Sequence, residues 1–367
     1  MRFLVTGSSG QLAHEFITRF ERDGIDCLAP AEALLDVTAP ALVEKAVAEY
    51  RPDVVLNCAA YNNVDGAEAD FATARAINAD AVRILADACI KHSAKLVHYS
   101  TDYVFDGAKE GLYTEEDEPH PINKYGESKL LGERIALECS GCRVPGSGFP
   151  AKGRLEGGGP PPNNVDRGSW IVARETNSQE PRTKNDARTN ASRESQVGGP
   201  SQTNKSEKTR TTHEEQHGNR SCSRHYLNPS ALVLRTSWLY GPGEQNFLFK
   251  LRGWAEKNQV LKVVTDEVSV PTYTADLVEY TLRAVNAGLR GLYHLTNCGY
   301  ASRYEWARAY LQLLGKDNLV LPVTGDLFET AARRPYFTAM SNRKLSEALG
   351  VEIPTWENAL ERFAHRE

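Results

Sequence analysis

The connection between the first predicted strand and the first predicted helix reads Thr6-Gly7-Ser8-Ser9-Gly10-Gln11-Leu12-Ala13. The apolar run Phe3-Leu4-Val5 precedes it, and a helical pattern follows it as far as Asp23. Gly7 and Gly10 stand where the backbone must approach a pyrophosphate, which a helix amino terminus holds well. The stretch therefore predicts a strand, a phosphate-binding turn and a helix, although a simple tight turn would also use two glycines.

Short apolar runs alternate with helical patterns throughout residues 1–138. The expected strands are residues 2–6, 26–29, 54–58 and 95–100, and the expected helices are residues 11–23, 40–50 and 70–92. This repetition of βαβ units predicts an α/β fold with a doubly wound, parallel, Rossmann-like sheet. Residues 1–138 would form the first part of a dinucleotide-binding domain.

The pattern stops between residues 139 and 226. From Ala173 to His225 the only large aliphatic residue is Val197, so this stretch cannot bury enough apolar surface to offset the ordering of its chain. We interpret 139–226 as a low-complexity insertion, either disordered or a loose excursion, and not as a domain.

Regular patterns return in the last part of the chain. Strands are expected at residues 231–235, 261–265 and 291–297, and helices at residues 247–258, 274–286, 304–314 and 342–349. Residues 227–367 would therefore supply the rest of the sheet and a smaller substrate-binding lobe, which could close the crevice at the carboxyl ends of the strands.

Three side chains carry the candidate chemistry. Tyr125 and Lys129 are four residues apart on one face of a helix, and Thr101 ends the fourth strand about 25 residues earlier. A lysine charge favours tyrosinate, so we expect Lys129 to lower the pKa of Tyr125 and make it a proton donor for a carbonyl. Thr101 would fix the carbonyl oxygen. A Tyr-x3-Lys match by chance and an ordinary strand threonine are the alternatives.

The end of the second strand leaves the cofactor open. Pro30-Ala31 offers neither the acidic residue that holds an NAD ribose nor a basic residue for a 2′-phosphate. NADPH and NADH are therefore both compatible with the sequence. Asp36 comes later, either near the adenine or as a solvated turn carboxylate.

Composition limits the partners. The net charge is −5, and because the insertion is basic the remainder of the chain is acidic, which argues against nucleic-acid binding. No stretch approaches the roughly 20 apolar residues of a membrane span. The strand that follows Met1 directly leaves no room for a signal segment, and scattered cysteines in apolar contexts fit a reduced compartment, so we expect a cytoplasmic protein.

Motifs in both halves resemble the dTDP-4-dehydrorhamnose reductases, which are extended short-chain dehydrogenase/reductases. The matching stretches include Asn57-Cys58-Ala59-Ala60-Tyr61, Ser100-Thr101-Asp102-Tyr103, Tyr125-Gly126-Glu127-Ser128-Lys129, Thr236-Ser237-Trp238 and Arg333-Arg334-Pro335. The resemblance covers nearly everything outside 139–226. It implies reduction of the 4-keto group of dTDP-4-dehydro-L-rhamnose to dTDP-L-rhamnose by NADPH or NADH.

The resemblance also implies site residues. The cofactor would contact Gly10, Gln11, Leu12, Asp36, Val37, Ala60, Tyr61, Asn62, Tyr125 and Lys129, in addition to Gly7 of the turn. The dTDP-sugar would contact Thr101, Asp102 and Trp238, of which Trp238 could instead be core. Members of the family can use Mg²⁺ at a homodimer contact, where Glu15 is a candidate ligand or a surface carboxylate. We assign no catalytic metal.

Two features depart from the family pattern besides the insertion. Ala13 replaces the usual third glycine, and Asp266-Glu267-Val268-Ser269 stands where the family tends to have Asp-Gln-x-Gly. The second departure concerns the substrate side and affects the identity of the sugar more than the type of reaction.

Other functions remain open on the sequence alone. A non-catalytic relative, like the regulatory subunit of methionine adenosyltransferase, would not need the Thr-Tyr-Lys triad, whereas another nucleotide-sugar reductase, an epimerase or a dehydratase would share it. Cys139, Cys142, Cys222 and His225 bracket the insertion and either bind Zn²⁺ or are unrelated side chains.

Overall fold

The computed structural model describes residues 1–138 and 231–366. The predicted insertion at 139–226 lies outside the described residues, and so do Cys139, Cys142, Cys222 and His225. The domain boundaries and the zinc hypothesis therefore stay predictions.

A six-stranded sheet has the order β10-β5-β4-β3-β1-β2, and all its neighbouring strands are parallel. Its strands are β1 (Phe3–Thr6), β2 (Cys27–Leu28), β3 (Val54–Asn57), β4 (Lys95–Thr101), β5 (Leu232–Thr236) and β10 (Gly291–His294). Every residue of β1, β3 and β5 is buried, as expected for a parallel sheet covered on both faces. The predicted α/β, Rossmann-like fold is confirmed.

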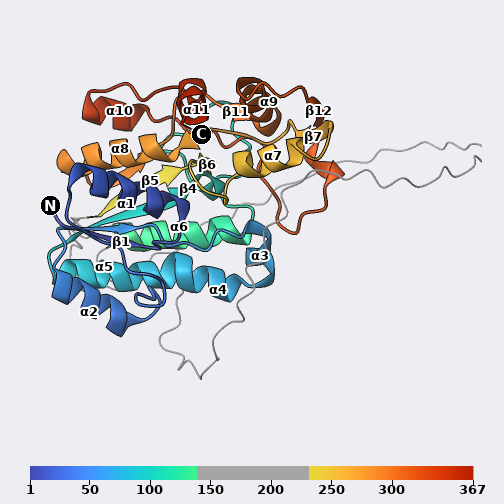
Figure 1. The fold of residues 1–367 in the computed structure, drawn as a ribbon. Helices are drawn as coiled ribbons and strands as arrows, with labels where there is room; N and C mark the ends of the chain where they lie inside the picture. Colours follow the sequence, from blue (N-terminus) through green and yellow to red (C-terminus); the bar gives the residue numbers. More distant parts are fainter. Residues whose placement is uncertain (139–230, 367) are drawn as a thin grey trace, which may run out of the picture. The chain divides into compact units, whose positions relative to one another are not determined.

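Helices cover both faces of this sheet (Figure 1). On one face lie α1 (Gln11–Asp23) and α8 (Thr274–Asn286), which pack with Val5 and Leu56. On the other face lie α2 (Pro40–Tyr50), α5 (Ala81–Lys91) and α6 (Lys124–Leu137), which pack with Leu4 and Val55. Successive strand residues point to opposite faces, so each strand contributes to both cores.

The strand order creates a crevice beside β1. β2 lies on one side of β1 and β3 lies on the other, so the chain changes direction across the sheet at this point. Ligands of open α/β sheets bind at such a switch point, outside the carboxyl ends of the strands. The turn after β1 is therefore in the expected position for a cofactor.

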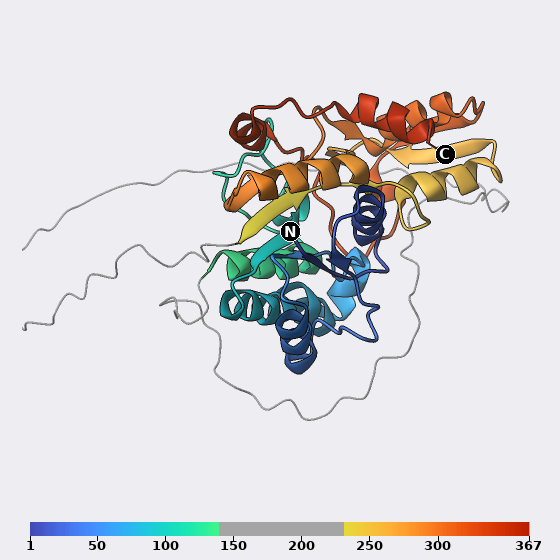
Figure 2. The same cartoon turned by 60° about the vertical axis from the view of Figure 1, so that its left-hand side comes forward.

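The C-terminal elements form a core of their own, and Figure 2 shows them gathered at the top of the view. Its helices are α7 (Phe247–Ala255), α9 (Arg303–Leu313) and α11 (Trp356–Ala364), and α10 (Arg343–Leu349) packs against β10 and α8 instead. Three two-stranded sheets also lie in this C-terminal segment: β6 (Leu239–Tyr240) with β9 (Thr272–Tyr273), β8 (Val268–Ser269) with β11 (Ala301–Ser302), and β7 (Val260–Val264) with β12 (Leu319–Val323).

The prediction of one continuous helix over residues 70–92 is wrong in the interior of that segment. The segment consists of α4 (Phe71–Arg75), the π-helical turn η1 (Ala76–Asp80) and α5, and the short helix α3 (Val64–Ala69) precedes it. The π turn directs Asn78 inward, where its amide bonds the backbone of Tyr61 and the hydroxyl of Ser128. These tertiary hydrogen bonds outweigh the regular helical repeat of the alanines.

Candidate active site

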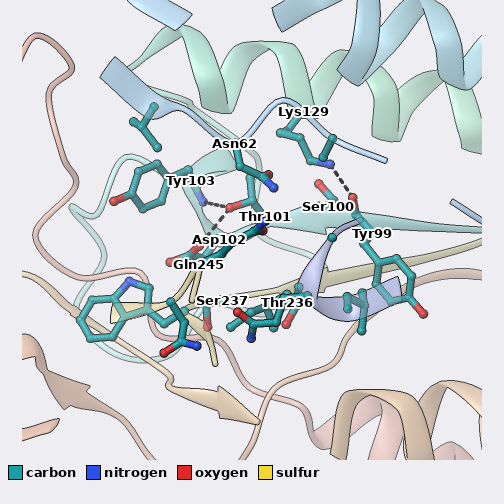
Figure 3. Close-up of a pocket in the computed structure, with 18 of the residues that line it drawn as sticks. Asn62, Tyr99, Ser100, Thr101, Asp102, Tyr103, Lys129, Thr236, Ser237 and Gln245 are labelled. Atoms are coloured by element: carbon teal, nitrogen blue, oxygen red, sulfur yellow. Dashed lines mark hydrogen bonds between the residues drawn. The ribbon is translucent and has the colours of Figure 1, made fainter. Parts of the chain in front are cut away.

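A cavity of about 280 Å³ opens at the carboxyl ends of the strands. Its walls come from the turn before α1, the loop after β3, the end of β4, the start of α6, the loop after β5 and the starts of α7 and α9. Figure 3 shows how these side chains converge on it. Both halves of the described chain thus contribute to one site.

The turn after β1 is shaped by Gly7 and Gly10. Gly7 has φ +65°, and a Cβ atom there would lie 2.7 Å from the backbone of Ala59. Gly10 is the N-cap of α1 and offers no side-chain cap, which leaves the positive end of the helix available to an anion. Gln11 lines the cavity with a buried Nε2 atom that has no hydrogen-bond partner among the described residues. These features fit a dinucleotide pyrophosphate.

Lys129 is buried, with 4% of its surface exposed, and its Nζ donates to the backbone oxygen of Tyr99 at 2.6 Å (Figure 3). Burial lowers its pKa from 10.5 to about 8, while the charge of Glu133 opposes the shift. The ammonium is thus held against β4, at the base of the cavity.

The pKa of Tyr125 differs from the expectation. Burial raises its pKa, a hydrogen bond with Thr101 acts in the opposite direction, and the charge of Asp102 raises the pKa further. The prediction of a lowered Tyr125 pKa is wrong for this structure, because desolvation dominates. Tyr125 therefore keeps its proton at neutral pH, as a general acid must before it reacts.

Thr101 and Asp102 lie together at the end of β4 (Figure 3). Thr101 Oγ1 donates to Asp102 Oδ1 at 3.1 Å and accepts from the backbone N–H of Tyr103 at 3.2 Å. Asp102 is 2% exposed, and burial raises its pKa although three hydroxyl groups and Arg303 stabilise its charge. The Thr101 hydroxyl thus has a defined orientation beside the cavity.

Trp238 also lines the cavity and has a left-handed backbone conformation with φ +41°. Its ring stacks on Trp306 with a centroid separation of 5.7 Å, and Arg303 Cζ lies 3.6 Å from its centroid. A non-glycine residue in this conformation is strained and persists only where its surroundings hold it, as at ligand sites.

The comparisons with known proteins agree with this geometry. Residues 1–144 and 217–367 match the family described as RmlD substrate binding domain. The chain belongs to the dTDP-4-dehydrorhamnose reductase family. A dTDP-4-dehydrorhamnose reductase of Mycobacterium tuberculosis is 30% identical, with 98% of this chain and 91% of that protein covered. One of Burkholderia thailandensis is 28% identical, covering 98% and 97%.

Solved structures support the same assignment. The chain is similar to a dTDP-4-dehydrorhamnose reductase of Bacillus anthracis in complex with NADP, with a TM-score of 0.72, 27% identity, and coverage of 100% of this chain and 99% of that one. Family membership confirms the expected oxidoreductase class.

Most predicted site residues line the cavity. They are Gly10, Gln11, Leu12, Ala60, Asn62, Thr101, Asp102, Tyr125, Lys129 and Trp238. Gly7 lies behind the lining, where it shapes the turn. The proposed contacts of all these residues with cofactor or sugar stay predictions.

Besides Gly7, three predicted cofactor residues lie outside the cavity lining. Asp36 is exposed and accepts from the backbone and hydroxyl of Thr38, at 2.8 and 2.7 Å, so it closes its own turn. Val37 packs in the core beneath α2 and α5. Tyr61 is held by its backbone to Asn78.

The expectation of Mg²⁺ at Glu15 finds no support. Glu15 accepts a hydrogen bond from Arg366 at 3.0 Å, and the described residues contain no group of three or more His, Cys, Asp or Glu side chains suited to a metal. Membrane spans are a separate matter. Among the described residues, drawn in colour in Figure 1, no helix is long and apolar enough to cross a bilayer.

Sequence reasoning missed several residues around the site. Asn78 ties the cavity loop at Tyr61 to the helix of Tyr125, and Arg303 lies over Trp238 while its Nε is 3.7 Å from Glu267. The departure at residues 266–269 was the available signal for Glu267. No sequence signal pointed to the π turn that carries Asn78.

Proposed function

We propose that the protein reduces the 4-keto group of dTDP-4-dehydro-L-rhamnose to give dTDP-L-rhamnose, using NADPH or NADH. The observation that carries this proposal is that Tyr125, Lys129 and Thr101 line the same cavity as the uncapped amino terminus of α1. The names of the relatives support the substrate, and the NADP complex of the Bacillus anthracis protein supports the cofactor.

The bound cofactor supplies a hydride to the carbonyl carbon. Tyr125 gives its proton to the carbonyl oxygen, so the ketone gains a hydride and a proton and becomes an alcohol. Burial of Tyr125 keeps the proton in place until the oxygen becomes basic. Lys129, with a pKa of about 8, is largely protonated at neutral pH, and its ammonium would hold the nicotinamide ribose. Thr101, which donates its proton to Asp102, also bonds the Tyr125 phenol and so orients the proton donor.

The test follows oxidation of NADPH and NADH when the protein is mixed with dTDP-4-dehydro-L-rhamnose. We expect turnover by the native protein and a loss of about 10²- to 10⁴-fold in kcat for Tyr125→Phe, the usual contribution of a general acid. Tyr280→Phe is the matched control, because Tyr280 lies on α8, does not line the cavity, and donates from its phenol to the Glu352 carbonyl. The absence of turnover, with no effect of Tyr125→Phe, would contradict the reductase and favour a non-catalytic relative.

Assembly is a separate part of the proposal. We infer a homodimer from the family resemblance alone, and light scattering of the purified protein measures it.

A further inference from the structure

The carboxylate of Asp102 is held by residues far away in the sequence. Its Oδ2 atom accepts hydrogen bonds from Ser269 Oγ at 2.8 Å and from Thr338 Oγ1 at 2.5 Å. Its other oxygen, Oδ1, accepts from Thr101 Oγ1 at 3.1 Å. One carboxylate therefore connects the Thr101 hydroxyl with two hydroxyl groups of the C-terminal elements.

Ser269 and Thr338 are themselves fixed by backbone pairing. Ser269 lies in β8, which pairs with β11, and the backbone N–H of Thr338 donates to Val268 at 2.9 Å. Both side chains are buried, and neither of these two described residues lines the cavity. Their hydroxyl groups therefore contact Asp102 without lining the cavity.

The surroundings make this arrangement sensitive to the loss of a donor. Asp102 is almost fully buried, and an ionised carboxylate in such a place depends on hydrogen bonds and nearby positive charge. Arg303 supplies the positive charge, and Glu267 lies beside Arg303. The charge of Asp102 in turn raises the pKa of Tyr103 and of Tyr125. Each hydroxyl group that donates to Asp102 therefore matters to its position and its charge.

We propose that Ser269 and Thr338 are positioning residues for the reduction: by holding Oδ2 of Asp102 they fix Oδ1, and through it the Thr101 side chain that bonds and orients the Tyr125 phenol. The inference rests on the proposed function and extends it to residues that contact neither cofactor nor sugar. Besides the expected contact with the sugar, Asp102 would then connect Thr101 with Ser269 and Thr338, because its two oxygens accept hydrogen bonds from these three hydroxyl groups. The family pattern tends to have glycine at position 269, so this chain adds a donor there.

The test measures steady-state kinetics of Thr338→Val, which keeps the shape of the side chain and removes its hydroxyl group. We expect kcat to fall about tenfold, as for a lost hydrogen bond to a charged group, with KM values for both substrates changed less than about twofold. Thr338→Ser restores a hydroxyl group and should restore kcat. Thr272→Val is the matched control: its buried hydroxyl donates to the Val270 carbonyl at 3.2 Å in the same region.

Two further readouts separate positioning from a general loss of structure. Removing a donor raises the pKa of Asp102, so the acid limb of the kcat profile should move to higher pH in Thr338→Val and not in Thr272→Val. Ser269→Ala and Thr338→Val should be non-additive, because both donors act on one oxygen.

The outcomes are distinguishable. Native kcat in folded Thr338→Val and Ser269→Ala, or an equal loss in Thr272→Val, overturns the positioning role and leaves the reductase intact. A loss confined to KM also overturns it, because the residues would then serve binding. A native protein without turnover overturns the proposed function and this inference together.

Discussion

Gly7 and Gly24 have the same backbone conformation in different surroundings. Their φ angles are +65° and +64°, but a Cβ atom at Gly7 would lie 2.7 Å from the backbone of Ala59, whereas one at Gly24 meets nothing within 4 Å. Alanine at Gly24 should cost about 1 kcal/mol of stability, from φ alone. Alanine at Gly7 should cost more, and it should weaken NADPH binding at least about tenfold, because the turn must move away from β3.

The measurements are chemical denaturation and NADPH titration of both variants. Gly24→Ala controls for backbone strain at the other end of α1, away from the turn. Equal NADPH affinity in the two variants would show that the contact between Gly7 and Ala59 does not shape the cofactor site.

The lowered pKa of Lys129 predicts that the stability of the protein rises with pH. Its folded-state pKa is about 8 and its ordinary value is 10.5, so the unfolded chain binds more protons between these pH values. Stability must then increase as pH rises through that window, by roughly 3 kcal/mol in total for this group. Below pH 8 the cost of burying the ammonium is present in full. Lys129→Met should remove this contribution.

The check is urea denaturation of the native protein and of Lys129→Met at several pH values from 7 to 10.5. Subtracting one curve from the other cancels titrations common to both proteins. A difference that does not change with pH would contradict the lowered pKa.

The shared position of Tyr125 and Lys129 was predictable from the sequence, while their electrostatics were not. The four-residue spacing of Tyr125 and Lys129 placed both on one face of α6, and both line the cavity. The direction in which the Tyr125 pKa shifts depends first on burial and then on the contact with Thr101 and the charge of Asp102, which only the tertiary structure reveals.

At the scale of elements, a buried ion pair joins α6 to β5. Arg235 donates from Nε to Glu133 Oε2 at 2.9 Å and from Nη2 to Oε1 at 2.5 Å, and both side chains are buried. His294 lies 3.3 Å from Arg235 Nη1, and burial lowers its pKa to about 3, so the ring is neutral. The pair therefore fixes the helix that carries Tyr125 and Lys129 against the sheet.

Glu133→Ala should destabilise the protein by about 3–5 kcal/mol, because it leaves the guanidinium buried without its carboxylate. The double variant Glu133→Leu, Arg235→Met should recover much of that loss, since it removes both charges. Glu44→Ala, which breaks an exposed pair with Lys91, should cost less than about 1 kcal/mol. Thermal and urea unfolding measure all three. A loss in the double variant as large as in Glu133→Ala would contradict this view of the pair.

Long periodic elements were predicted best. The helices α1, α2 and α8 have the expected bounds, because each carries a clear apolar face between recognisable ends. Two-residue strands such as β6, β8, β9 and β11 have no periodicity to detect. The π turn at Asn78 was missed for another reason: its hydrogen bonds reach Tyr61 and Ser128, which lie 17 and 50 residues away in the sequence.

At the scale of the whole molecule, the order of the sheet indicates how the two halves of the chain belong together. β5 lies beside β4 and pairs with it from Val97 to Thr101, and α6 contacts both strands. This is the arrangement of a β-strand, a crossover helix and a parallel strand. In the fold, α6 and β5 are therefore successive elements of one crossover unit, although residues 138 and 231 are far apart in sequence.

Joining Glu138 directly to Asn228 should therefore keep both fold and activity. The deletion leaves five residues between Leu137 and Leu232, namely Glu138 and residues 228–231, which is within the usual two to six for such a connection. We expect kcat within about twofold of the native value and no loss of thermal stability, because a shorter loop costs less closure entropy. Turnover and thermal unfolding of the purified variant measure this, and the same deletion carrying Tyr125→Phe should be inactive. A soluble, folded deletion variant without turnover would show that residues 139–227 contribute to the site, and that the reductase cannot be understood from its sheet and C-terminal elements alone.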